Sequence, residues 1–151
     1  MAKDEGGKIG IVTALVRSAF LVNEVYAAAS RVYGLTPQQG QLLCVLMPGP
    51  TGMSELGCKL GLAKSSLTGL VDRTSRLGLV HRETCPTDRR AVRVALTGEG
   101  ARTAEEFYAE TCRRIAELPA GLEGPERELL AELLGRVVTD NEVPDVFADQ
   151  D

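Results

Sequence analysis

The apolar positions near the start of the chain follow the three- and four-residue spacing of an α-helix. Between residues 11 and 33 one apolar stripe is formed by Ile11, Leu15, Ala19, Val22, Tyr26 and Ala29. A second apolar group, which widens this stripe, consists of Val12, Val16, Phe20, Leu21 and Val25. A helix that is apolar on several sides needs more than one packing partner, so we expect it to be buried against more than its own subunit.

Clear helix stop and start signals follow this segment. Gly34 is suited to end the first helix, because helices commonly finish with a residue in the left-handed conformation. Thr36 and Gln39 have the spacing of a capping box, and Pro37 stands at the first helical position. We therefore predict a second helix that begins at Pro37 and ends before the turn at residues 48–50.

Two helices joined by a tight turn are predicted next. The first spans Met53–Leu60 and stops at Gly61, and the second spans residues 64–77. The apolar face of the second comprises Leu67, Leu70, Val71, Thr74 and Leu77, and its other face comprises Ser65, Ser66, Thr68, Gly69 and Arg73. Small hydroxyl side chains can hydrogen-bond to base edges or phosphates in a major groove, although this face also fits an ordinary solvated helix.

Two β-type segments come after this helix. They span residues 79–84 and 91–96, and residues 85–90 between them contain Pro86, Arg89 and Arg90. We expect a hairpin whose connection is too long for a two-residue turn and whose tip is rich in arginine. An arginine at such a tip can enter a narrow minor groove, where the potential is most negative.

The last third of the chain predicts two more helices and a tail. Thr97 is placed to cap a helix that runs to Leu118, residues 119–121 break it, and a final helix spans about residues 125–138. The acidic tail at residues 141–151 is expected to be loose. The fold class is therefore mainly α, with a winged helix-turn-helix at residues 36–97 (the winged-helix part) inside one domain of residues 1–151.

The distribution of charge changes how the overall balance is interpreted. The chain has a net charge of −4, which by itself is unusual for a protein that binds nucleic acid. Residues 53–97 hold eight Lys or Arg and four Asp or Glu, a local charge of +4, so the remainder carries −8. Only the surface that meets phosphates needs to be basic, so a basic module within an acidic chain is compatible with DNA binding.

Several classes of site have little support in the sequence. The four cysteines stand singly and His81 is the only histidine, so we expect no disulfide, no metal site and no cofactor. No nucleophile and base pair or phosphate loop can be assembled, so we do not expect an enzyme. No signal peptide or continuous apolar run of membrane-spanning length is apparent, so we expect a cytoplasmic protein without a membrane partner.

The segment at residues 60–100 resembles the winged-helix core of the MarR family of transcription regulators. The matching motifs are Gly78-Leu79-Val80, Asp88-Arg89-Arg90 and Leu96-Thr97-Gly98-Glu99-Gly100. The resemblance implies an obligate homodimer, with dimerisation helices at residues 10–34 and 98–140, that binds a pseudo-palindromic operator. It further implies a repressor released by a small anionic or phenolic ligand.

The resemblance and the residue pattern together indicate a set of DNA-binding residues. The set comprises Lys64, Ser65, Ser66, Thr68, Arg73, Arg89 and Arg90. The fourth helix would lie in the major groove, with Lys64 on a phosphate, and the wing arginines in the minor groove. Asp88 is expected to orient a neighbouring arginine. Asp72 and Arg73 could form a similar brace, either with a role in DNA binding or as a purely structural ion pair.

Two positions depart from the family pattern. Ala63 stands before the fourth helix where Ser, Thr or Asp is usual, so this helix start lacks a side-chain cap worth about 1 kcal/mol. Gly69 stands where a longer polar or basic side chain is common, which removes a possible contact with a base or a phosphate.

Two alternative functions remain open at this point. One is a thiol-based, redox-responsive regulator that uses Cys85, which is expected to be the only exposed cysteine, while Cys44, Cys58 and Cys112 pack as small hydrophobic residues. The other is a winged-helix module that contacts protein instead of DNA.

Overall fold

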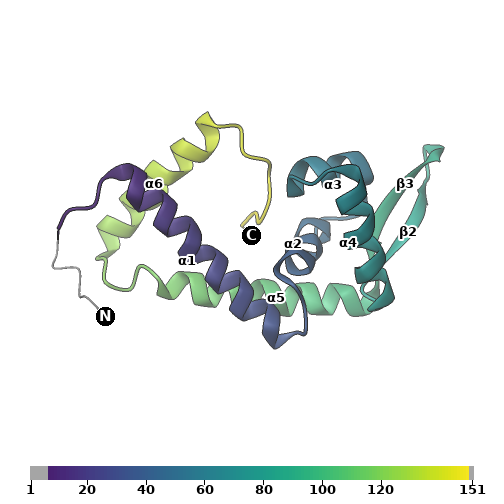
Figure 1. Ribbon diagram of the computed structural model, residues 1–151, viewed down its shortest axis with the longest axis horizontal. Helices are drawn as coiled ribbons and strands as arrows, with labels where there is room; N and C mark the ends of the chain where they lie inside the picture. The colour runs from purple at the N-terminus through teal and green to yellow at the C-terminus, as the bar shows by residue number, and fades with distance from the viewer. Residues whose placement is uncertain (1–6, 150–151) are drawn as a thin grey trace.

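The computed structural model describes residues 7–149. The first six residues of the predicted domain and the last two residues of the acidic tail lie outside the described part. Within it, the fold has six helices and three short strands (Figure 1). The elements are α1 Ile11–Val32, α2 Pro37–Leu46, β1 Thr51–Gly52, α3 Met53–Leu60, α4 Lys64–Arg76, β2 Val80–Cys85, β3 Asp88–Leu96, α5 Gly98–Glu117 and α6 Gly124–Asp140. The mainly α fold with a wing, predicted from the sequence, is confirmed.

The molecule is elongated, and α5 connects its two ends (Figure 1). One end holds α6 and the start of α1, and the other holds α2, α3, α4 and the wing. Local signals set the boundaries. The Thr36 hydroxyl accepts from the Gln39 amide at 3.2 Å, and the Gln39 side chain accepts from the Thr36 amide at 2.9 Å, which completes the predicted capping box.

The core of the winged-helix part forms around α2. Seven of the ten residues of α2 are buried, and Leu42, Leu43 and Leu46 are at most 1% exposed. They pack against Leu56 of α3, Leu67, Leu70 and Val71 of α4, and Val80 and Val94 of the sheet. Leu77 was predicted on this apolar face and is 48% exposed, because α4 ends at Arg76 and the chain turns away.

A second cluster joins α2 to the long helices. The Phe107 ring of α5 is fully buried and lies against the backbone of α2 at Gly40. A Cβ atom at Gly40 would lie 2.4 Å from Phe107 Cζ, closer than atoms can approach, so this contact requires glycine. Ala29 of α1 and Cys44 of α2 complete the buried part of the cluster.

The sheet differs from the prediction in two ways. Its strand order is β1-β3-β2, and β1, which the sequence did not predict, pairs Thr51 with Val94. The connection at the wing tip has two residues, 86 and 87, because Cys85 pairs with Asp88. The expected longer loop is wrong, because the extra length is absorbed by an irregularity in which residues 89–91 lie opposite the step from Thr84 to Cys85.

The start of α5 is fixed to the end of α4. The Thr97 hydroxyl accepts from the Gly100 amide at 3.0 Å, as predicted for a cap, and donates to the Gly78 carbonyl at 2.6 Å. Gly78 has φ +76°, the left-handed conformation that favours glycine. A Cβ atom at Gly100 would lie 1.8 Å from the Leu79 carbonyl oxygen, so α5 begins in direct backbone contact with the entrance to β2.

Helices α1 and α6 leave broad apolar surfaces uncovered in the single chain. Val12 is 73% exposed and Phe20 68% exposed on α1, and Leu129 is 55% exposed on α6. By length and composition alone α1 could cross a membrane, with a mean hydropathy of 1.4 over 18 residues of which 6% are buried. Polar residues within α1 interrupt this segment, so the sequence has no continuous apolar run of membrane-spanning length there.

Residues 146–148 of the tail are packed against the helices, contrary to the expectation of a loose tail from its acidic composition. Phe147 packs against Tyr26 and Tyr108, and Val146 packs against the core of the winged-helix part. These two apolar side chains interrupt the acidic tail and pack between α1, α2 and α5.

Replacing Gly100 with alanine should lower the free energy of unfolding by about 3 kcal/mol, because the new Cβ meets a backbone carbonyl that cannot move without shifting α5. Gly98→Ala is the matched control. No atom lies within 4 Å of a Cβ at Gly98, so this change should alter stability by less than about 1 kcal/mol. Urea unfolding followed by circular dichroism compares the two variants, and equal stabilities would contradict the close backbone contact.

Candidate nucleic-acid interface

The predicted contact residues lie on two elements that reach the same edge of the molecule. The start of α4 and the tip of the wing both project toward the upper edge in Figure 1. Lys64, Ser65, Ser66 and Arg73 of α4 are exposed, and so are Arg89 and Arg90 at the wing tip. The buried face of α4 holds this arrangement, because Leu67, Leu70 and Val71 anchor the helix in the core.

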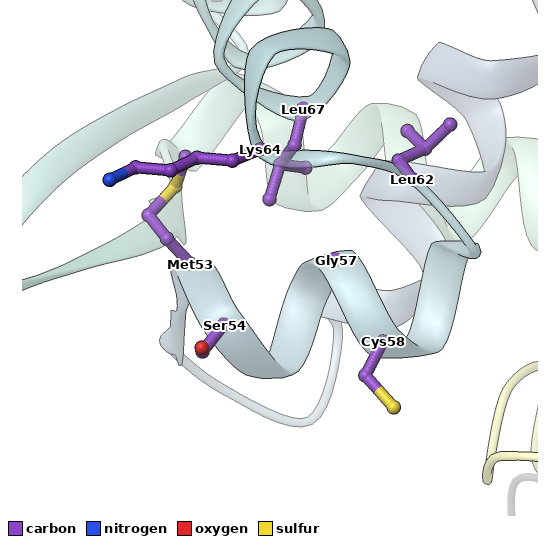
Figure 2. A pocket seen from close by; sticks show the side chains of 7 residues that line it. All are labelled: Met53, Ser54, Gly57, Cys58, Leu62, Lys64 and Leu67. Carbon is purple, nitrogen blue, oxygen red and sulfur yellow. The ribbon is translucent and has the colours of Figure 1, made fainter.

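A hollow of about 520 Å³ lies between the start of α3 and the start of α4 (Figure 2). Lys64 extends along its rim above Met53, with its ammonium group at the open end (Figure 2). Ser54, on the first turn of α3, presents its hydroxyl toward the outside of the same hollow (Figure 2). Ser54 was not among the predicted residues. Its place in the first turn of the helix before α4 could have indicated from the sequence that it lies near the same surface.

The start of α4 has no side-chain cap. Ala63 has an extended backbone, with φ −66° and ψ 156°, and makes no capping hydrogen bond, as predicted. The backbone N–H groups of a first helical turn have no partner within the helix, and the helix dipole makes this end electropositive. The N–H groups of this uncapped, exposed first turn next to Lys64 can donate to a phosphate oxygen in place of a side-chain cap.

Gly69 makes room for Arg73. A Cβ atom at Gly69 would lie 3.1 Å from Nη1 of Arg73, so the guanidinium extends back along α4 over the glycine. The missing side chain at Gly69 therefore brings a cation from the next turn onto the polar face. The sequence analysis predicted the loss of a contact at Gly69, but it did not predict that the Arg73 guanidinium lies over this position.

Thr68 is less available than the other residues on this helix. Its side chain is half-buried, and its hydroxyl donates to the Lys64 carbonyl at 2.9 Å. Because this bond uses the hydroxyl proton, the oxygen can only accept a further hydrogen bond.

The predicted brace between Asp72 and Arg73 is wrong. Asp72 instead accepts from Arg82 at 2.8 Å, which ties α4 to strand β2. Adjacent residues on a helix point in different directions, so Asp72 faces the sheet while Arg73 faces outward. The ion pair holds the base of the wing against the helix.

The wing tip is organised by Asp88 and carries the two exposed arginines. The Asp88 carboxylate accepts from the backbone amide of Arg90 at 3.0 Å, so it does orient a neighbouring arginine, through the main chain. Nearer the base, Glu83 binds Arg93 at 2.6 Å and His81 at 3.4 Å. Positive charge at the base is therefore partly compensated, whereas the tip presents arginines.

The cysteines fall into different environments from those expected. Cys44 is buried, as predicted, and burial raises its pKa to about 12. Cys58 is exposed, contrary to the prediction, because its position on α3 faces away from Leu56 and the core. Cys85 and Cys112 are half-buried.

Cys85 has a polar environment that favours its thiolate. Its Sγ atom lies 3.3 Å from the Thr87 hydroxyl. Hydrogen bonds from the side chain and backbone of Thr87 and from the backbone of Asp88 lower the pKa of the Cys85 thiol. Among residues 7–149, no group of three or more His, Cys, Asp or Glu side chains has the geometry to hold a metal ion.

Comparisons with known proteins agree with this arrangement. The model of the MarR family matches residues 33–91. The chain is 31% identical over 114 residues to the uncharacterized HTH-type transcriptional regulator YkoM of Bacillus subtilis, and the match covers 75% of this chain and 74% of that protein. These similarities are to transcription regulators and not to enzymes.

Two solved structures extend the likeness to the whole fold. Apo MarR from E. coli is similar with a TM-score of 0.76 at 24% identity, covering 87% of this chain and 99% of that one. NadR in complex with 4-hydroxyphenylacetate is similar with a TM-score of 0.69 at 25% identity, covering 91% of this chain and 97% of that one. With the winged helix, its exposed cationic edge and a relative matched over about three quarters of both chains, this protein belongs to the MarR family of helix-turn-helix transcription regulators.

Proposed function

We propose that the protein is a homodimeric, cytoplasmic repressor that binds a pseudo-palindromic operator and is released by a small anionic or phenolic ligand. The observation that carries the proposal is the edge formed by α4 and the wing. Exposed hydroxyls and cations lie there on a module whose local charge is +4 in a chain of net charge −4.

Helix α4 and the wing contact different grooves of the DNA in this proposal. Ser65 and Ser66 stand at the exposed start of α4, where they can meet base edges in the major groove, with Lys64 and Arg73 beside them for phosphates. Thr68 can add only an acceptor. Arg89 and Arg90 extend the interface to the minor groove, where the electrostatic attraction for arginine is strongest.

Exposed apolar surface on α1 and α6 supports a dimer. Residues such as Phe20 and Leu129 are more than half exposed in the single chain, and contiguous apolar surface of this kind marks an interaction site. A two-fold pair of winged-helix parts would meet half-sites about 10 base pairs apart, one turn of DNA.

Release by a ligand requires that the two winged-helix parts of the dimer have two spacings in equilibrium, one that fits DNA and one that does not. A ligand shifts this equilibrium only if it binds the spacing that does not fit DNA more tightly. Support for an anionic or phenolic ligand comes from NadR, whose structure contains 4-hydroxyphenylacetate.

A thiol-responsive regulator is a second candidate, supported by the environment of Cys85. Its thiolate is favoured by hydrogen bonds, and it lies at the wing tip just before Arg89 and Arg90. Oxidation or alkylation there would add bulk beside the arginines that we assign to the minor groove.

The wing assignment is tested by replacing Arg89 and Arg90 with alanine. Removing two cations from the neighbourhood of the phosphates should weaken operator binding at least about tenfold. The slope of log K against log salt should fall by about 1 for each phosphate that is no longer neutralised. Lys8→Ala, at an exposed position before α1, is the control. Binding is measured by fluorescence anisotropy on DNA from upstream of the protein's own gene. Unchanged affinity and slope would exclude the wing, and no complex even at low salt would favour a protein-binding module.

The dimer is tested with Phe20→Asp. Because Phe20 is 68% exposed in the single chain, the substitution should leave the fold intact and convert a dimer of twice 16.1 kDa into a monomer. Gln38→Glu adds the same charge on the exposed first turn of α2 and should leave the dimer unchanged. Sedimentation equilibrium and circular dichroism measure both properties, and a folded wild-type monomer would contradict the proposal.

The role of Cys85 is tested through its neighbour. The hydrogen bond from Thr87 lowers the pKa of Cys85, so Thr87→Val should move the midpoint of Cys85 alkylation to higher pH and slow the reaction at pH 7. Cys58, which is exposed in the same chain, is the internal reference for iodoacetamide labelling mapped by mass spectrometry. If alkylation of Cys85 leaves operator affinity unchanged, the thiol-responsive candidate is excluded.

A further inference from the structure

The C-terminal segment returns from the end of α6 to the middle of the molecule. After Asp140 the chain turns back, and the described part of the tail, up to residue 149, lies between α1 and the winged-helix part (Figure 1). Glu142 and Phe147 have positive φ angles of 51° and 54°, which non-glycine residues seldom adopt. Such a conformation persists where surrounding contacts hold it.

On one side, the segment contacts the long helices. The Phe147 ring lies 4.7 Å from the Tyr108 ring of α5 and 5.9 Å from the Tyr26 ring of α1, the second in an edge-to-face arrangement. The Tyr108 hydroxyl donates to the Ala148 carbonyl at 2.9 Å. The space between α1, α5 and α2 that Phe147 occupies, here called the slot, therefore offers aromatic surfaces and a hydrogen-bond donor.

On the other side, the segment contacts the winged-helix part. Val146 packs against the core formed around α2, and Phe147 packs against the cluster that contains Cys44. Two cavities flank the segment. One of about 130 Å³ lies toward Lys59 and Leu60 of α3, and one of about 330 Å³ lies toward Met47 and Pro48.

The segment does not fill the cleft in which it lies, because the two cavities remain beside it. Cys44, Val45 and Phe147 line both cavities, so Phe147 lies between them and borders the same spaces as the buried Cys44. Phe147 is only half-buried, and a cavity lies against it on each side. A side chain in such a position is more easily displaced than a residue of the core.

We propose that residues 143–149 form an intramolecular plug, in which Phe147 fills an aromatic slot between α1, α5 and α2, and that a free aromatic compound of similar size competes with it. Because the plug contacts both the long helices and the winged-helix part, its removal takes away one set of contacts between the two parts. The occupancy of the slot does not depend on DNA binding, whereas its effect on an operator rests on the proposed function.

Competition with the plug changes the apparent affinity of any compound that uses the slot. A site that is open only a fraction of the time binds its ligand more weakly by that fraction. A plug closed about nine-tenths of the time weakens binding about tenfold. The sequence of the tail would thus set the concentration at which a ligand acts.

Cys44 provides a reporter for the plug. In full-length protein with Cys58, Cys85 and Cys112 replaced by serine, the rate of reaction of Cys44 with an aromatic disulfide reagent is measured. Phe147→Ala, and a stop after Glu142, should each raise this rate at least about tenfold, because the reagent gains access and water stabilises the thiolate. Val143→Ala, at a position 49% exposed in the same segment, is the matched control. If the triple serine variant does not fold, labelling of Cys44 is mapped by mass spectrometry in the natural chain.

A cavity rescue tests the competition. Millimolar phenylacetate should slow the reaction of Cys44 in Phe147→Ala toward the wild-type rate, because its ring fills the vacated space. Equal Cys44 rates in the wild type, Phe147→Ala and the truncated chain would overturn the plug, and absence of rescue would overturn the competition. Neither measurement involves DNA, so an operator that fails to bind would count against the proposed function and leave this result intact.

Discussion

The packing of the Phe107 ring against the backbone at Gly40 determines where the winged-helix part stands relative to the long helices. Phe107 belongs to α5, which runs the length of the molecule, and Gly40 belongs to α2, around which the winged-helix core forms. A second rigid contact, between Gly100 and the Leu79 carbonyl, fixes the start of α5 to the entrance of the wing. Because both contacts are too close for a side chain, they leave little room for adjustment.

The contact between Phe107 and Gly40, here called the joint, also lies close to the C-terminal segment. Phe147 attaches to the aromatic cluster that contains Phe107, Tyr26 and Tyr108, so the plug and the joint share the same side chains. Whatever occupies this cleft acts directly on the contact that positions the winged-helix part. A compound bound there therefore needs no long chain of intervening residues to reach α2.

At the edge that we propose to face DNA, two positions that weaken α4 as an isolated helix have a second effect through their neighbours. Ala63 leaves the first turn uncapped, but that turn is exposed beside Lys64 and open to an anion. Gly69 costs helix propensity, but the Arg73 guanidinium lies over it. The ion pair from Asp72 to Arg82 then ties this helix to the wing, the two elements that we propose for the major and the minor groove.

The sequence by itself determined the helices, the caps at Thr36 and Thr97, and the family. These depend on residues within a few positions of one another, as in the capping box at Thr36 or the motif that ends at Gly100. Tertiary structure alone decided the third strand at Thr51, the two-residue wing tip, the partner of Asp72 and the exposure of Cys58. Each depends on which distant surface the chain meets. The docked tail is the clearest case, because its acidic composition predicts a loose segment and only the cleft between α1, α5 and α2 gives Val146 and Phe147 a place to pack.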